Sequence, residues 1–518
     1  MKTLTFTLLC LALAAQAQPP NQMTLVGQYD GEAAWNFFGT YTTMGDFDGD
    51  GMDEFVINAY GWNNYAGKNY FYQYDQGWPA SPFLTVQGAQ DGISYGQWCA
   101  NLGDINGDGL PDLGLPNASN IDSRLDVFFG SNPVDTLPDW TLNPPSPTQS
   151  YASHLGSCGD VNGDSGWDFM MMPRYYSSPN FTAIEVFFGG EVLDSIADWA
   201  LWPTNLGPHP LGDVNADGYA DIMALGLNNE PVEIYFGGNP MDTIPDMVFY
   251  EYSNGNGRGV GDVNGDGYPD FCINMHFPDS SQNHSAVYFG GPGVDNIPDV
   301  LLQNRLGQLW SAPHGITCGD FNGDGYNDVV SATGDLSLGD IVYIYLGGPW
   351  FNPVPDAWVT IVSTIFYFGY EISSGDVNGD GRDELLVSAT NYGNFNRGRV
   401  YLYEGPETWI DSGAAVEPEN LKHYPGWFKL NQNYPNPFNG TTSICFQLGK
   451  ASMVNLCIWD LRGGKIKELI KNQNMTPGGY NVSWTGKNGV DQTVASGIYL
   501  LQLKVNHYEQ IKKMALLR

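Results

Sequence analysis

The sequence of 518 residues has little positive charge, few cysteines and no long apolar run after its first residues. Lys and Arg total 21 against 57 Asp and Glu, so the formal net charge is −36 at pH 7. Nucleic acids and anionic membranes attract clustered positive charge, and this chain offers little of it. No stretch approaches the roughly 18 apolar residues of a membrane span. The motifs G-x-S-x-G, H-E-x-x-H and a Gly-rich phosphate loop are missing too. We therefore expect no nucleic-acid partner, no transmembrane segment and no catalytic site.

The residues that are abundant indicate a folded all-β protein. The sequence holds 65 Gly and 33 Pro, and 14% of its residues are aromatic while only 15% are charged. Such a composition is typical of many short strands joined by tight turns. The charge changes sign along the chain. Residues 18–426 hold nine basic residues and 53 acidic ones, and residues 427–518 hold eleven basic and four acidic. This change predicts a domain boundary near residue 426.

The N-terminus has the pattern of an export signal. Lys2 supplies a positive charge, Leu4 to Ala15 form an apolar run, and Ala15-Gln16-Ala17 resembles a cleavage site. We expect residues 1–17 to be removed. Six cysteines then remain. We expect Cys99, Cys158, Cys272 and Cys318 as buried thiols. Cys445 and Cys457 are expected on neighbouring strands, where the choice between thiols and a cross-strand disulfide stays open.

A repeat of about 55 residues organises the first 400 positions. Seven segments share the pattern D-x-[DN]-x-D-G-x-x-[DE], from Asp46 to Asp376 at their first residues. A strand resembling VYFGG follows most of them, and then a segment resembling PDW. Each unit therefore reads as four strands, and seven such units predict a seven-bladed β-propeller. An additional apolar strand, Met23 to Gln28, precedes the first unit and is expected to complete the last blade.

The acidic loops have the ligand spacing of a calcium site. Positions 1, 3, 5 and 9 supply side-chain oxygens, position 7 supplies a carbonyl, and Gly at position 6 allows a sharp turn. The third loop has Ser165 at that Gly position, so its turn is the least regular. We expect up to seven Ca²⁺ ions, bound by Asp46, Asp48, Asp50, Glu54, Asp104, Asn106, Asp108, Asp112, Asp160, Asn162, Asp164, Asp168, Asp213, Asn215, Asp217, Asp221, Asp262, Asn264, Asp266, Asp270, Asp320, Asn322, Asp324, Asp328, Asp376, Asn378, Asp380 and Glu384.

The repeats resemble FG-GAP/VCBS repeats, the family of the integrin α-chain propeller. The matching residues are Phe38-Gly39, Phe368-Gly369, the seven acidic segments and the VYFGG strands. The resemblance covers residues 23 to 405. It implies Ca²⁺ in the hairpin between the first two strands of each blade, and a role in binding, commonly adhesion. It does not identify a ligand.

The last 92 residues form a different unit. Alternating stretches such as SICFQL at Ser443 and GIYLLQLKV at Gly497 predict a small Ig-like β-sandwich. The segments LNQNYPNPFNGTTSI, IWDLRGGKI, VSWTGKNG and ASGIYLLQL closely resemble the type IX secretion C-terminal sorting domain, with a related pattern in flagellar hook-capping proteins. This resemblance implies recognition by the type IX machinery and passage across the outer membrane.

Strand alternation predicts which face of the propeller binds a ligand. The acidic loops join the first and second strands, so the loops between the second and third strands lie on the opposite face. Those loops vary between units and carry aromatic residues, which concentrate at binding sites. The candidates are Trp62, Tyr65, Tyr175, Tyr176, Phe181, His276, Phe277, Tyr392, Phe395 and Arg397. His154, His209 and His314 belong to different units and are expected to be ordinary strand residues, too far apart for a cluster.

The sequence thus predicts an all-β protein, a seven-bladed β-propeller followed by a small Ig-like β-sandwich. The expected parts are a signal peptide at 1–17, the propeller at 18–410, a linker at 411–426 and the sorting domain at 427–518. The expected function is that of a secreted or cell-surface calcium-binding protein that binds an extracellular protein or glycan. The alternative is a polysaccharide-active enzyme that uses the propeller face or channel.

Overall fold

The computed structural model describes two compact units, Met1–Ala415 and Val416–Arg518. Within these units the described residues are 21–410 and 428–516, with gaps at 118–122, 145–148, 152–153, 176–180, 205, 227–230, 250–251, 277–282, 305–312, 336–338, 350, 362–366, 394, 431–432, 434, 437, 449–451, 461–463, 477, 490–491 and 506–507. The expected signal peptide and linker lie outside the described residues. Among the described residues, no helix has the length and apolar content needed to cross a membrane.

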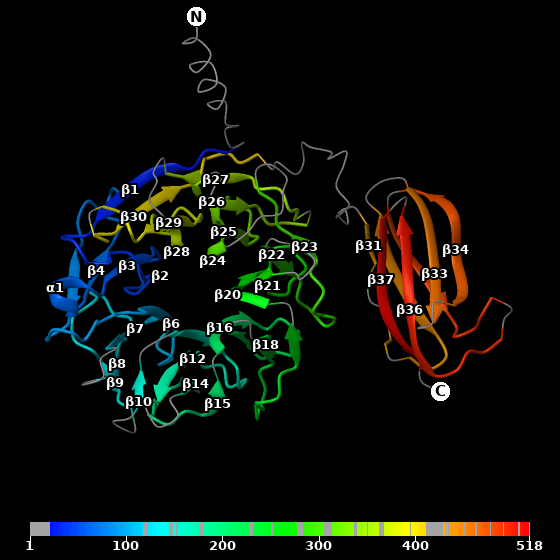
Figure 1. Cartoon of the computed structure of the whole chain (residues 1–518), viewed down its shortest axis with the longest axis horizontal. Helices are drawn as coiled ribbons and strands as arrows, with labels where there is room; N and C mark the ends of the chain where they lie inside the picture. Colours follow the sequence, from blue (N-terminus) through cyan, green and yellow to red (C-terminus); the bar gives the residue numbers. More distant parts are fainter. Residues whose placement is uncertain are drawn as a thin grey trace, which may run out of the picture. The chain divides into compact units, whose positions relative to one another are not determined.

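The first unit consists of antiparallel sheets arranged in a ring (Figure 1). Six sheets have four strands each and one has six. The first three sheets in chain order contain β2 (Thr42–Gly45), β3 (Glu54–Ala59), β4 (Lys68–Tyr72) and β5 (Leu84–Gln87); β6 (Ala100–Gly103), β7 (Asp112–Asn117), β8 (Arg124–Phe128) and β9 (Trp140–Leu142); and β10 (Gln149–Tyr151), β11 (Gly156–Gly159), β12 (Asp168–Met171), β13 (Pro173–Tyr175), β14 (Phe181–Phe187) and β15 (Trp199–Thr204). A short helix, α1 (Trp62–Tyr65), joins β3 to β4.

The remaining sheets of the ring repeat the same order of strands. They contain β16 (Leu206–Gly212), β17 (Asp221–Gly226), β18 (Val232–Tyr235) and β19 (Met247–Phe249); β20 (Tyr252–Gly261), β21 (Asp270–His276), β22 (Asn283–Tyr288) and β23 (Val300–Leu301); β24 (Pro313–Gly319), β25 (Asp328–Asp335), β26 (Gly339–Tyr345) and β27 (Ala357–Thr360); and β28 (Phe368–Gly375), β29 (Glu384–Ala389), β30 (Arg399–Glu404) and β1 (Thr24–Asp30). The predicted propeller fold is confirmed. The third sheet differs from the expected four strands, because β10 and β13 extend it.

The ring closes between the two ends of the propeller sequence. The N-terminal strand β1 pairs antiparallel with β30, so it is the outermost strand of the last sheet, as the sequence predicted. The innermost strands contact one another in succession, β2 with β6, then β11, β16, β20, β24 and β28, and β28 contacts β2 again. β1 thus covers the edge of β30, which would otherwise be open to pairing with another chain.

Apolar side chains fill the spaces between neighbouring sheets. All six residues of β3, β7, β17 and β29 are buried, because these second strands are covered on both faces. One core joins Phe55 and Tyr72 of the first sheet to Leu386 and Leu402 of the last. Because both faces of these strands are covered, their sequences are continuously apolar. A sheet with one solvent-exposed face would instead alternate apolar and polar residues along each strand.

The second unit has two sheets around one core. The first contains β31 (Phe428–Leu430), β32 (Thr442–Leu448) and β35 (Gly478–Trp484), and the other contains β33 (Ser452–Asp460), β34 (Lys465–Met475), β36 (Gly497–Val505) and β37 (Tyr508–Leu516). Trp484, Ile444 and Leu456 pack in the core between them. The expectation that Cys445 and Cys457 lie on neighbouring strands is wrong, because β32 and β33 belong to different sheets. Both cysteines are free thiols.

Candidate functional site

Each acidic loop joins the first and second strands of its own sheet, where the sequence placed it. In every loop the first Asp accepts the backbone N–H groups of positions 5 and 6, as Asp104 does from Asp108 at 2.9 Å and Gly109 at 2.8 Å. The position 5 carboxylate accepts the N–H of position 7 in all seven loops. These bonds fold each loop tightly and gather its carboxylates.

The acids at the ninth position of each loop accept buried backbone hydrogen bonds, a role that the sequence did not predict. They are Glu54, Asp112, Asp168, Asp221, Asp270, Asp328 and Glu384, and all are buried. Each accepts the N–H of position 2 of its own loop, as Asp112 does from Ile105 at 3.0 Å. In five loops the second oxygen accepts the N–H of the Gly that lies two residues after the third strand. Each of these five acids therefore ties a loop to the third strand of its sheet.

Glu54 of the first loop differs from the other ninth-position acids. Its Oε2 accepts the N–H of Phe47 at 3.0 Å, but its Oε1 is buried and has no hydrogen-bond partner among the described residues. Burial, with the charges of Asp48, Asp50 and Asp46, raises the pKa of Glu54 to about 8. The oxygens of Asp46, Asp48 and Asp50 lie within 4.8 Å of one another. This set of oxygen donors, with one unsatisfied buried carboxylate oxygen, fits a hard divalent cation.

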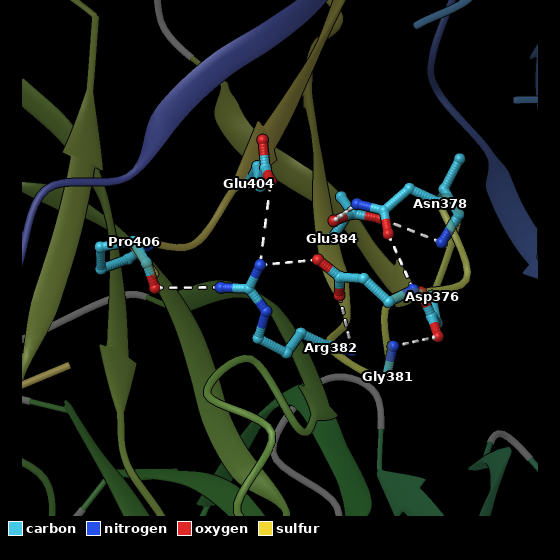
Figure 2. Close-up of polar contacts among 9 residues, drawn as sticks. Asp376, Asn378, Gly381, Arg382, Glu384, Glu404 and Pro406 are labelled. Atoms are coloured by element: carbon cyan, nitrogen blue, oxygen red, sulfur yellow. Dashed lines mark hydrogen bonds and ion pairs between the residues drawn. The ribbon is translucent and has the colours of Figure 1, made fainter. Parts of the chain in front are cut away.

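The third and last loops show how the shared turn tolerates variation. Ser165 takes the Gly position of the third loop with φ of 75°, close to the 95° of Gly109, and the loop keeps the same hydrogen bonds. In the last loop Arg382 donates to Asp380 at 2.6 Å and to the Pro406 carbonyl at 3.1 Å (Figure 2). This guanidinium neutralises part of the charge that the loop carboxylates concentrate.

Hydrogen bonds also join loops of neighbouring sheets. In four of the seven loops the N–H of position 8 donates to the carbonyl of the first Asp in the preceding loop, as Ala220 does to Asp160 at 2.8 Å and Asp383 to Asp320 at 2.9 Å. In two other loops position 8 is a proline, Pro111 or Pro269, which has no N–H to donate. A bond of the same kind joins Asp53 of the first loop to Asp376 of the last. The two loops of each such pair are therefore bonded directly to one another.

A cavity of about 1000 Å³ runs along the innermost strands, from Tyr41 and Tyr370 at one end to Asp104 at the other. His154 and His209 line it, with ring centroids 6.0 Å apart. The expectation that these two histidines lie too far apart to meet is therefore wrong, because the innermost strands converge on the axis of the ring. Burial lowers the pKa of His154 to about 4 and that of His209 to about 3. The side chain of His314 lies outside the described part of the chain.

The face opposite the acidic loops carries a cluster of aromatic rings at the junction of the first and last sheets. Trp35 stacks on Phe395 at 5.5 Å between ring centroids, and Phe37 stacks on Tyr60 at 4.9 Å. Trp35 is 51% exposed, Phe395 66% and Tyr65 43%, so these rings meet solvent. We call Trp35, Phe37, Tyr60, Tyr65 and Phe395 the seam cluster.

The backbone of the seam cluster is strained. Trp35, Phe37, Tyr65 and Phe395 all have φ between 53° and 64°, a region that side chains larger than Gly rarely adopt. Such strain persists where surrounding bonds impose it, and it gathers at functional sites. Here Trp35 donates its N–H to the Phe395 carbonyl at 2.7 Å, and Phe37 donates its own to the Asn396 carbonyl at 3.1 Å. No sequence signal identified Trp35 and Phe37.

Several predicted ligand residues lie at the seam cluster or beside it. Tyr65 and Phe395 belong to it. Trp62 donates from Nε1 to Glu32 at 2.9 Å, and Arg397 donates to the Gly31 carbonyl. Tyr392 lies under the Arg399 guanidinium, 3.7 Å from its ring centroid. Tyr176 and Phe277 lie outside the described residues, as do the side chains of Tyr175, Phe181 and His276.

Comparison with known proteins agrees with the repeats and the tail. The family model described as "FG-GAP repeat" matches residues 368–403, and the model described as "Secretion system C-terminal sorting domain" matches residues 432–516. Human integrin alpha-6 is 29% identical over 130 residues, which are 24% of this chain and 11% of that protein. Integrin alpha-PS2 of Drosophila melanogaster is 23% identical over 242 residues, covering 42% of this chain and 17% of the integrin. The chain thus spans less than a fifth of the length of these relatives.

Among solved structures, one of PorZ is similar at 12% identity with a TM-score of 0.34, covering 95% of this chain and 60% of that one. PorZ is described as an essential bacterial surface component of the type-IX secretion system of Porphyromonas gingivalis. The match of residues 432–516 indicates export by type IX secretion, to the cell surface or the medium. This chain therefore carries an integrin-like FG-GAP repeat in a β-propeller and ends in a type IX secretion C-terminal sorting domain.

Proposed function

We propose that this exported propeller binds calcium in its acidic loops and acts as a binding protein without catalytic activity. The observation that carries the calcium assignment is the first loop, where the buried Glu54 Oε1 has no partner near the gathered carboxylates of Asp46, Asp48 and Asp50. A buried carboxylate oxygen without a partner is costly, and a hard cation removes that cost. The likeness to integrin FG-GAP repeats supports the same assignment for the other loops.

Calcium would serve the propeller as a structural ion. Residues at positions 1, 3, 5 and 9 of each loop would hold it, and the ion would supply positive charge among carboxylates that otherwise repel one another. The bonds between neighbouring loops, such as Asp383 to Asp320, join four pairs of these sites. The ion is thus proposed to hold the sheets together, at a distance from the ligand.

We place the extracellular ligand, a protein or a glycan, on the face of the seam cluster. Exposed aromatic rings held by a rigid backbone make contact area at little entropic cost. Trp35, Tyr65 and Phe395 are exposed and strained, and Lys68 and Trp62 both hydrogen-bond Glu32 beside them. This surface is therefore ready for a partner without rearrangement.

The test is a glycan and matrix-protein array probed with the full chain in calcium and in chelator. Phe395→Ala should lose the array signal at unchanged melting temperature, since its ring is 66% exposed. Ile244→Ala, at an exposed residue 71% accessible that follows the third strand of another sheet, is the matched control and should keep the signal. Equal signals from wild type and Phe395→Ala would contradict the assignment of the face. A turnover assay on the same glycans tests the enzymatic alternative.

A further inference from the structure

The cavity at the centre of the ring is built from residues that the repeats do not share. Aligned on the first Asp of each acidic loop, the residue four positions earlier is Arg258 in the fifth repeat. The other repeats have Thr42, Ala100, Gly156, His209, Ile316 and Ile372 at that position. Every repeat makes the same propeller, so the fold does not require a guanidinium here. Residues that depart from a repeat on a shared scaffold are candidates for function.

Among the described side chains of β20, that of Arg258 is the one that lines the cavity. Gly257 and Gly259 flank it, and they allow β20 to pack closely on the neighbouring sheet. A Cβ added at Gly257 would come within 2.8 Å of the Met223 side chain, and one at Gly259 within 2.7 Å of the Leu211 backbone. Arg258 itself is exposed and lines the cavity wall. The close packing of its neighbours thus fixes where the guanidinium can reach.

Arg258 is the one permanently cationic side chain among the described residues of the cavity wall. Within the described part of the chain, no hydrogen bond and no ion pair within 4 Å reaches its guanidinium. A guanidinium offers five N–H donors in a plane that suits two oxygens of one carboxylate. The carboxylate of Glu371 in the same wall interacts with this charge only at longer range, so the hydrogen-bonding positions of the guanidinium are open to a ligand.

Glu371 of β28 lines the same wall, and the charge of Arg258 acts to lower its pKa, which burial raises to about 8. The wall is otherwise mainly polar. His154 and His209 lie in the two preceding repeats, and the buried His154 Nδ1 has no partner among the described residues. Tyr41 and Tyr370 place phenol groups at one end, and the Tyr370 ring is 42% exposed. Neutral donors and acceptors beside an aromatic ring suit hydroxyl groups and an apolar C–H face. The acidic loop residue Asp104 lies at the other end.

We propose that the central cavity binds a uronic acid, a sugar whose carboxylate pairs with Arg258 while its hydroxyls contact the histidine and tyrosine side of the wall. The volume of about 1000 Å³ admits a saccharide of one or a few units with water. The carboxylate of the sugar becomes the hydrogen-bonding partner that Arg258 lacks within the chain. A sugar hydroxyl hydrogen-bonds to the unsatisfied Nδ1 of His154. This site is separate from the seam cluster and from the acidic loops, so it stands independently of the proposed function.

The experiment is calorimetric titration of the full chain with sodium glucuronate, with glucose and with sodium acetate. Glucuronate should bind with saturation, and glucose and acetate should bind at least tenfold more weakly, because each lacks one part of the recognised chemistry. Arg258→Gln should weaken glucuronate binding at least tenfold, and Arg258→Lys should weaken it less. Lys471→Gln removes one positive charge from the sorting domain, 76% exposed at its side chain, and should bind as wild type does.

Three results of these titrations would overturn the proposal or a part of it. Absence of saturable glucuronate binding by the wild type overturns the proposal, as does equal binding by Arg258→Gln with an unchanged melting temperature. Acetate binding as tightly as glucuronate overturns the saccharide assignment. If Arg258→Gln does not fold, the wild-type comparison of glucuronate with glucose decides alone, since glucose differs by lacking the carboxylate.

Discussion

The backbone N–H of Asp53 donates a hydrogen bond of 2.8 Å to the backbone carbonyl of Asp376, which joins the first acidic loop to the last. These two residues lie at opposite ends of the repeat sequence. The same kind of bond joins Ala220 to Asp160 and Asp383 to Asp320. Four pairs of neighbouring acidic loops are therefore bonded to one another, in addition to the bonds that hold each loop to its own sheet.

Removal of calcium should lower the melting temperature. A ligand that binds only the folded state stabilises it by about 2.7 kcal/mol per site at a concentration of 100 Kd. Scanning calorimetry in calcium and in excess chelator measures the effect on the full chain. Equal melting temperatures in the two conditions would contradict metal binding by the acidic loops.

Asp112→Asn should destabilise the protein even without calcium. Both oxygens of Asp112 accept backbone N–H groups, from Ile105 and Gly130, each at 3.0 Å. An Asn amide would turn one acceptor into a donor that faces an N–H. We expect a loss of about 1–3 kcal/mol in the free energy of unfolding, measured by urea denaturation in chelator.

The control for Asp112→Asn is Asp108→Asn in the same loop. Asn keeps the oxygen that accepts the N–H of Leu110 and loses only the acceptor of an exposed bond from Asn106, which contributes little because water replaces it. Its effect should therefore appear in calcium and vanish in chelator. If Asp112→Asn were also silent in chelator, its buried hydrogen bonds would not contribute as described.

Ser165→Gly should stabilise the third loop. Ser165 has φ of 75°, in a region that Gly adopts without steric cost. Relief of the left-handed conformation exceeds the added entropy of the unfolded chain, and the net gain should be about 0.5–1 kcal/mol. Urea denaturation measures it, and Gly109→Ser in the second loop should give a loss of similar size. A neutral or destabilising Ser165→Gly would show that the loop does not hold this conformation in solution.

Acidification should destabilise the wild-type protein more than it destabilises the His154→Gln variant. Burial lowers the pKa of His154 to about 4, below the value near 6.5 of an unfolded chain. The unfolded state therefore binds the proton first, and the stability from this group is complete above pH 6.5 and declines as pH falls toward 4. The difference between the two proteins should reach about 2 kcal/mol at pH 5. Parallel stability curves from pH 7.5 to 5 would contradict a buried neutral imidazole.

Maturation should remove the two ends of the chain. Mass spectrometry of the secreted protein should find an N-terminus near Gln18, as the Ala15-Gln16-Ala17 pattern predicts. The sorting domain matched at residues 432–516 should be lost or attached to a surface lipid. A periplasmic protein that still ends at Arg518 would contradict type IX export.

The fold was predictable because the repeat carries it. Seven acidic segments, the glycine-ended strands and the additional strand before the first unit predict sheet order and ring closure, since each signal is local in sequence. The added strands β10 and β13 were not predictable, because the third repeat departs from the pattern there. The pairing of β32 and β33 was also misjudged, since adjacency in sequence does not say which strands of a sandwich share a sheet.

The candidate sites were predictable only in part. The loop ligands follow a spacing, but the buried hydrogen bonds of Asp112 and its equivalents need the third strand, which lies far along the chain. The meeting of His154 and His209 depends on how closely the inner strands approach the ring axis. Trp35 was missed because its strained conformation is imposed by a partner, Phe395, that is distant in sequence.

The pairing of β1 with β30 also sets an order of events during synthesis and export. Asp30 and Arg399 form an ion pair although 369 positions separate them. The strand that emerges from the ribosome early must wait for one made near the end of the propeller before it finds its partner. Until then the growing chain is an open arc with two unpaired edges, and long-range pairing of this kind is slow. The ring therefore cannot close until the whole propeller sequence has been made.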